Sequence, residues 1–195
     1  MGSGHNRSQA AKENEMYKRV LAIIRIGGRL EESQAPKLIT TITAARVFAP
    51  KGDVYFEPRS ATDLVAACIP AGLLELTDDE AELGEMPGIV ASCKELGLPY
   101  RLWSEAVGDA GAEVTTWAPG MDHPLVVTGD NYDHETFLVQ GPAVQRALTM
   151  LEAERVHEAA EALRAILPDI PELSPFEVVE VEEITATPET AHVAG

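Results

Sequence analysis

Hydrophobic residues recur at two different spacings along this chain, and the two spacings predict a mixture of strands and helices. Residues 20–26 are apolar at all but one position, which is typical of a strand covered on both faces. Residues 36–48 and 61–69 carry apolar residues at helical spacing. Short alternating segments predict further strands at 54–57, 73–76, 100–105, 113–117, 125–128 and 136–140.

The most sharply defined segment lies between Met86 and Met121. Pro87 suits the first turn of a helix, Gly97 suits the left-handed residue that ends one, and Pro99 favours extended backbone before it. Two alternating segments follow this helix and are separated by a glycine-rich turn. Together with the two predicted strands after residue 124, they predict an antiparallel meander of four strands.

Apolar residues between Val144 and Leu167 hold a helical period, and this pattern predicts one long C-terminal helix that begins at Pro142. The predicted fold class is therefore α+β, with a mixed or antiparallel sheet in a two-layer, ferredoxin-like or similar arrangement. We expect the long helix to pack across this sheet. The predicted organisation is a flexible arm at 1–17, one domain at 18–168, and an acidic tail at 169–195 with an edge strand at 176–184.

The composition is that of a globular protein, because 45% of the 195 residues are hydrophobic. No apolar run approaches the roughly 20 residues of a membrane span, and the polar N-terminus lacks the apolar centre of a signal peptide. These features predict a cytoplasmic protein that does not contact a membrane. Cys68 and Cys93 have apolar neighbours, so we expect two reduced, buried thiols and no disulfide.

The charge is distributed unevenly along the chain. Of the net charge of −17, residues 1–61 contribute +4 and residues 62–195 contribute −21. The acidic part should repel nucleic acids and membrane surfaces and should attract a basic protein surface. Residues 77–85 are expected to be a solvated connector within this part. The expected acidic binding face comprises Glu75, Asp78, Asp79, Glu80, Glu82, Glu85, Glu154, Glu158 and Glu161.

These patterns predict a non-catalytic interaction protein, without a cofactor, that occupies a basic surface of a partner protein. One version of this function is mimicry of a nucleic acid, in which carboxylates take the place of phosphates. The glycine pair Gly27–Gly28 follows the first strand, where nucleotide-binding folds place a phosphate loop. The phosphate-binding patterns G-x-G-x-x-G and G-x-x-x-x-G-K-[ST] do not occur here, so nucleotide binding is not expected. Both a monomer and an oligomer fit the sequence.

The central segment contains a set of residues spread over about 30 positions: Cys93, Gly97-Leu98-Pro99-Tyr100-Arg101, Ser104, Ala112-Glu113, Trp117 and Pro119-Gly120-Met121. This set resembles a group of small proteins encoded among plasmid and phage accessory genes. The resemblance implies a setting, that of an accessory protein of a mobile genetic element. It carries no catalytic residue over to this chain.

The alternative hypothesis is a small metal-dependent hydrolase or nuclease that uses Asp130, Asp133 and His134. Carboxylates and histidine in turns can bind a transition metal or transfer protons. A second histidine, His123, lies at the other end of the predicted strand 125–128, at about 17 Å, too far to share one ion. The competing explanation is that aspartates favour turns because they hydrogen-bond to nearby backbone.

Overall fold

The computed structural model of this chain describes residues 19–107, 111–131, 133, 136, 138–139, 141–167 and 169–180. The predicted arm at 1–17 and residues 181–195 of the predicted tail lie outside the described residues. The elements follow one another as β1 (Arg19–Ile26), β2 (Gly28–Glu31), η1 (Glu32–Gln34), α2 (Ala35–Ala45), α3 (Ala61–Ala66), β3 (Leu74–Glu82), α4 (Pro87–Leu96), β4 (Tyr100–Ser104), β5 (Glu113–Trp117), β6 (Leu125–Thr128), α5 (Gly141–Glu152), α6 (Val156–Ile166) and β7 (Phe176–Val179).

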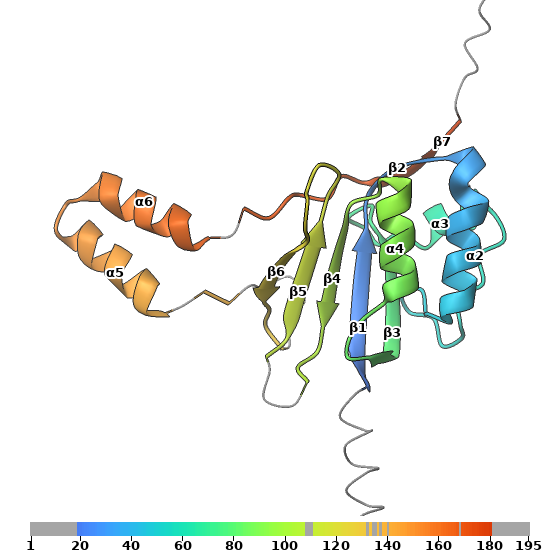
Figure 1. The fold of residues 1–195 in the computed structure, drawn as a ribbon, viewed down its shortest axis with the longest axis horizontal. Coiled ribbons are helices and arrows are strands. Elements are labelled where there is room, and N and C mark those ends of the chain that lie inside the picture. Colours follow the sequence, from blue (N-terminus) through green and yellow to red (C-terminus); the bar gives the residue numbers. More distant parts are fainter. Residues whose placement is uncertain are drawn as a thin grey trace, which may run out of the picture.

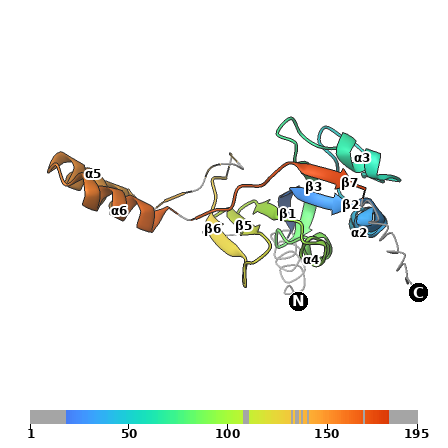
Figure 2. The same cartoon turned by 90° about the horizontal axis from the view of Figure 1, so that it is seen from above.

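Five strands form an antiparallel sheet in the order β3-β1-β4-β5-β6 (Figure 1). The central part of β1 pairs with β3 on one side and with β4 on the other. Helix α4 connects β3 to β4 across β1, so β3 and β4 run in the same direction with β1 between them. Helices α2 and α4 lie side by side in a second layer (Figures 1 and 2). The predicted α+β, two-layer fold class is confirmed.

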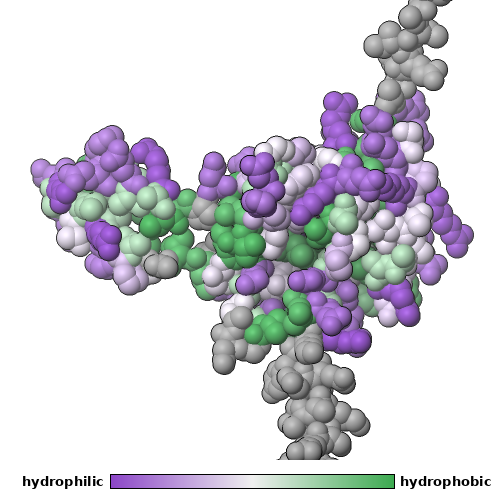
Figure 3. All heavy atoms as spheres, in the orientation of Figure 1, coloured by the Kyte–Doolittle hydropathy of each residue, from purple (hydrophilic) through white to green (hydrophobic). Residues whose placement is uncertain are grey.

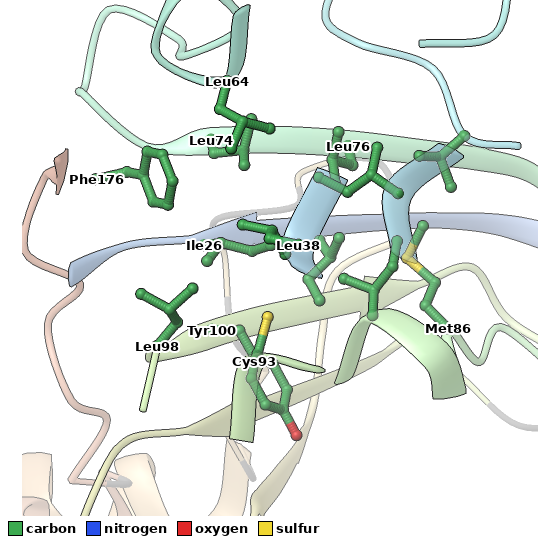
Figure 4. Packing of buried hydrophobic residues seen from close by; sticks show 14 of the residues in the cluster. Ile26, Leu38, Leu64, Leu74, Leu76, Met86, Cys93, Leu98, Tyr100 and Phe176 are labelled. Carbon is green, nitrogen blue, oxygen red and sulfur yellow. The ribbon is translucent and has the colours of Figure 1, made fainter. Parts of the chain in front are cut away.

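The main core lies between the two helices and the sheet. Alternate residues of β1, among them Ile24 and Ile26, point toward the helices and are fully buried, as are Leu38 of α2 and Leu76 of β3. These side chains belong to one cluster with Cys93 of α4 and Tyr100 of β4, and Figure 4 shows Ile26 and Leu38 between β3 and Cys93. Fully burying an aliphatic side chain contributes roughly 1.5–3 kcal/mol, so this layer supplies most of the stabilisation.

Loops and extended chain cover the other face of the sheet, where Ile23 and Trp103 form a second, smaller cluster. The indole Nε1 of Trp103 donates a hydrogen bond of 3.0 Å to the carbonyl oxygen of Asp130, which follows β6. Arg101 on the same face donates to the carbonyl oxygen of Pro171 at 3.3 Å. Residues 169–175, which we call the C-terminal strap, therefore run over this face.

The C-terminal strap leads the chain back into the main core. Strand β7 pairs in parallel with β2, and the ring of Phe176 is 4% exposed among the main-core residues (Figure 4). The amide of Gly28 donates to the carbonyl oxygen of Ser174 at 3.1 Å. A Cβ atom on Gly27 would lie 2.2 Å from that same oxygen. A close crossing of two backbone segments therefore requires glycine here. This crossing explains the glycine pair, and no phosphate-binding role is needed to account for it.

The prediction of one long C-terminal helix across the sheet is wrong. The segment forms two helices, α5 and α6, that pack against each other and project away from the sheet (Figures 1 and 2). Glu154, between them, adopts a left-handed conformation with φ of 59°. The apolar positions Leu151 and Val156 are five residues apart, which departs from the helical spacing of three or four and marks the break.

The helical hairpin α5–α6 buries little of its own surface. Its fully buried apolar side chains are Ala147 and Ala159, among the described residues. Leu148 and Val156 are 46% and 62% exposed. On the face drawn in Figure 3, hydrophobic residues gather on the hairpin and on the adjoining part of the sheet.

Strand β3 also differs from the prediction. It extends to Glu82, whereas the sequence predicted a strand at 73–76 followed by an acidic connector at 77–85. Pairing with the adjacent β1 holds residues up to Glu82 in the sheet, and this non-local support outweighs their low strand propensity. The predicted strand at 136–140 includes residues 137 and 140, which lie outside the described residues.

Candidate functional surfaces

Three of the expected binding residues lie exposed on β3, which is an edge strand of the sheet. The β1–β3 pairing shifts between Val20 and Ala22, so that Asp79 and Glu80 form a bulge opposite a single residue of β1. A bulge on an edge strand bends the backbone outward and discourages a further strand from pairing there. We call the exposed carboxylates Asp79, Glu80 and Glu82 the β3 acidic edge.

The other three expected residues of this group lie in different surroundings. Glu75 is partly buried and accepts a hydrogen bond of 2.8 Å from Arg25 of β1. Asp78 faces the helices and lines a cavity of about 510 Å³ between α2 and the start of α4; burial raises the pKa of its carboxyl. Glu85 is exposed and lies just before α4.

Glu80 of the β3 acidic edge pairs with Arg19 at 2.9 Å, and both side chains are more than 60% exposed. The described residues give Asp79 and Glu82 no ion pair. An exposed pair contributes little net stabilisation, on the order of 0–1 kcal/mol, so Glu80 keeps much of its capacity to bind another cation. The edge therefore carries negative charge that the described part of the chain leaves largely uncompensated.

The expected residues of the hairpin are arranged differently. Glu154 lies in the turn between α5 and α6. Glu158 forms an ion pair with Arg155, which lowers the pKa of its carboxyl, and Glu161 lies 3.3 Å from Nε2 of His157. Local partners at helical spacing therefore accompany two of these three carboxylates.

The structure does not bring the two acidic groups onto one face. Strand β3 forms one edge of the sheet and β6 forms the opposite edge. The hairpin projects beyond the β6 side, so strands β1, β4, β5 and β6 lie between it and the β3 acidic edge (Figures 1 and 2). The expected acidic face is thus two separate surfaces, of which the β3 acidic edge is the less neutralised.

Basic residues from the first third of the chain pair with acidic residues from the rest. Besides Arg19 and Arg25, Lys37 of α2 pairs with Glu95 of α4, and Arg29 approaches Glu177 at 4.0 Å. Four basic residues of the first third therefore have acidic partners in the rest of the chain, and most of the acidic residues there remain without such a partner among the described residues.

The carboxylates proposed for a metal-dependent site serve a turn. Oδ1 of Asp130 accepts a hydrogen bond from the amide of Asp133 at 3.0 Å, and Oδ2 of Asp133 accepts one from Oγ1 of Thr136 at 2.6 Å. These are the backbone and side-chain bonds by which aspartate stabilises turns. His134 lies outside the described residues. No group of three or more potential metal ligands comes together in the described ranges.

Both cysteines are free thiols, as predicted. Cys93 is fully buried in α4, and burial raises its pKa to about 12, which leaves the thiol protonated at neutral pH. Cys68 is half-buried, and burial raises its pKa as well. Neither thiol has the lowered pKa that characterises a nucleophilic cysteine.

A groove beside α4 was not anticipated from the sequence. It encloses about 390 Å³ between α4, β4, β5 and the residue Pro124 before β6. Tyr100 and Leu102 from β4 and Lys94 from α4 are among the residues that line it. Strand alternation puts Tyr100 and Leu102 on one face of β4, but the opening between the helix and the strands depends on the tertiary packing.

Across the described residues, no helix is both long enough and apolar enough to cross a membrane. The chain matches no protein-family model, no curated protein and no solved structure.

Proposed function

We propose that this chain is a non-catalytic interaction protein that binds a basic surface of a partner protein through its β3 acidic edge. The observation that carries the proposal is the row of exposed carboxylates on β3, two of which have no ion pair within the described structure. The acidic residues of the hairpin support the proposal less, because Glu158 pairs with Arg155 and Glu161 lies next to His157.

Electrostatic complementarity supports this choice of partner. A row of carboxylates on a rigid strand attracts Lys and Arg side chains and increases the rate of association with a basic protein. The same field repels nucleic acid and anionic membranes. A sheet edge also fixes the backbone from which these side chains project, which reduces the entropy lost on binding.

Nucleic-acid mimicry is the narrower form of this proposal. Alternate residues of a strand lie about 6.6 Å apart, which is close to two steps of 3.4 Å along one strand of DNA. Glu80 and Glu82 have this sequence spacing. In this form, the partner would be a DNA-binding protein, and duplex DNA would compete with the chain for it.

An acidic edge also protects a sheet from pairing with other chains, and this role needs no partner. The two roles make different predictions. Protection requires only that charges remain at the edge, so the protein would stay monodisperse and no specific basic partner would bind. A binding role requires a partner whose affinity depends on these three positions.

The test compares the wild-type protein with the triple variant Asp79→Asn, Glu80→Gln, Glu82→Gln. Partners would be captured from a lysate of the source cells, identified, purified and titrated at increasing salt concentrations. We expect wild-type affinity to fall steeply with salt, because exposed charges are screened over a Debye length of about 8–10 Å. The triple variant should bind more weakly and with a smaller dependence on salt.

A matched control removes three acids from the hairpin instead, through Glu154→Gln, Glu158→Gln and Glu161→Gln. Both variants change the net charge by three. If the β3 acidic edge is the binding surface, the hairpin variant keeps most of the affinity. Equal losses in the two variants, or an affinity that does not respond to salt, would contradict the proposal.

A further inference from the structure

The groove beside α4 contains a hydrogen-bond donor that the fold leaves unused. Tyr100 is fully buried, and its hydroxyl forms no hydrogen bond with any residue that the structure describes. Leaving a buried hydroxyl without a partner costs free energy, and native proteins usually avoid it. Such a group in the wall of a groove indicates a partner that arrives from outside the chain.

Tyr100 is one of the residues that line the groove, and its neighbours hold the ring in place. Its ring lies beside Cys93 and stacks against Trp117 at a centroid distance of 6.0 Å. Figure 4 shows the hydroxyl at the margin of the main core, pointing away from Ile26 and Leu38. Burial together with the nearby Cys93 thiol raises the pKa of Tyr100 to about 12, so the hydroxyl is a neutral donor at physiological pH.

The groove is polar at its two ends and apolar between them. Lys94 is exposed at one end of α4 and forms no ion pair with the described residues, and Glu85 lies at the other. Glu85 lies two residues before α4 begins, and the helix rises by about 10 Å from Pro87 to Lys94. Val90 and Leu102 lie between them and provide an apolar wall.

These features select one class of ligand. A carboxylate accepts hydrogen bonds both from a phenol and from an ammonium group, and it would avoid the end at Glu85. The apolar wall requires a hydrophobic body, and a volume of about 390 Å³ lies within the usual range for small-molecule sites. We infer that the groove binds a small hydrophobic carboxylate, held by the Tyr100 hydroxyl and the Lys94 ammonium group. The inference goes beyond the proposed function and does not depend on it.

The experiment uses 4-phenylbutyrate and octanoate as probes and the full-length protein labelled for NMR. Titration of each probe should shift the amide signals of residues in α4, β4 and β5, with saturation in the micromolar to millimolar range. The uncharged 4-phenylbutyramide should bind at least about tenfold more weakly, because it lacks the carboxylate that pairs with Lys94. No shifts in the groove with either carboxylate, or equal affinity for the amide, would overturn the inference.

Two conservative variants assign the roles of the polar residues. Tyr100→Phe removes only the oxygen, so we expect an intact fold, an unchanged or higher melting temperature and at least about tenfold weaker probe binding. Lys94→Gln should weaken carboxylate binding and leave amide binding unchanged.

Tyr55→Phe and Lys51→Gln are the matched controls, because both residues are exposed and lie outside the groove. Neither control should change probe binding. A Tyr100→Phe protein that binds the probe like wild type would refute the inference. So would a marked loss of stability, since it would show that the hydroxyl already has a structural partner.

Discussion

Substitution of Phe176 tests whether the C-terminal strap and β7 belong to the folded body. Its ring is 4% exposed and packs in the main core near Leu64, Leu74 and Leu98 (Figure 4). Replacing a buried Phe by Ala typically costs about 3–5 kcal/mol, from lost burial and the cavity left behind. Because a native domain is stable by about 5–15 kcal/mol, Phe176→Ala should remove a large part of the total.

Equilibrium unfolding in urea measures this loss. We expect a lower transition midpoint with an unchanged slope, and a melting temperature lower by roughly 10 °C for a chain of this size. The control is Glu177→Ala at the adjacent exposed position, where the contact with Arg29 is long and solvated. That variant should change the stability by less than about 0.5 kcal/mol. A loss below about 1 kcal/mol for Phe176→Ala would refute the docking of β7 on the core.

Three further predictions follow from single positions. Gly27→Ala should destabilise the protein and increase amide exchange in the C-terminal strap, because the new Cβ would lie 2.2 Å from a strap carbonyl oxygen. Ellman's reagent at pH 8 should modify the half-buried Cys68 faster than Cys93, which should react only on unfolding. Asp63 has a lowered pKa, chiefly because the backbone amide of Arg59 donates a hydrogen bond to its carboxylate. The ionised carboxylate therefore stabilises the fold fully above pH 3.8, the ordinary pKa of aspartate. This stabilisation is lost as the pH falls through the lowered pKa of the folded protein. Unfolding of Asp63→Asn below about pH 5 should therefore lack part of the wild-type pH dependence.

Local signals predicted the elements whose ends depend on one or two residues. Helix α4 spans Pro87–Leu96 and ends at Gly97 with φ of 67°, as the proline and glycine positions indicated. A capping box starts α3, with Ser60 and Asp63 each accepting a hydrogen bond from the other's backbone amide; its Ser-x-x-Asp pattern can be read from the sequence. These interactions are completed within a few residues, so sequence alone contains the information.

Elements that depend on distant partners were predicted poorly. The second half of β3 is polar, and it forms a strand because β1 lies beside it. Phe176 reaches the core because the C-terminal strap crosses the sheet. The acidic composition of the tail does not predict this docking. The groove beside α4 likewise depends on how far the helix layer extends over β5, a property of packing that has no signature in the spacing of residues.

The distribution of charge follows the same division between local and distant contacts. The pairing of Glu158 with Arg155 and of Glu161 with His157 follows helical spacing and can be inferred from the sequence. Glu80 and Arg19 are 61 residues apart in the sequence, and they meet because strands β3 and β1 pair. A run of acids is therefore a poor guide to a binding surface until its partners are known. In this fold, the described residues leave two of the three carboxylates of the β3 acidic edge without an ion pair, so binding to a basic protein should be sought there first.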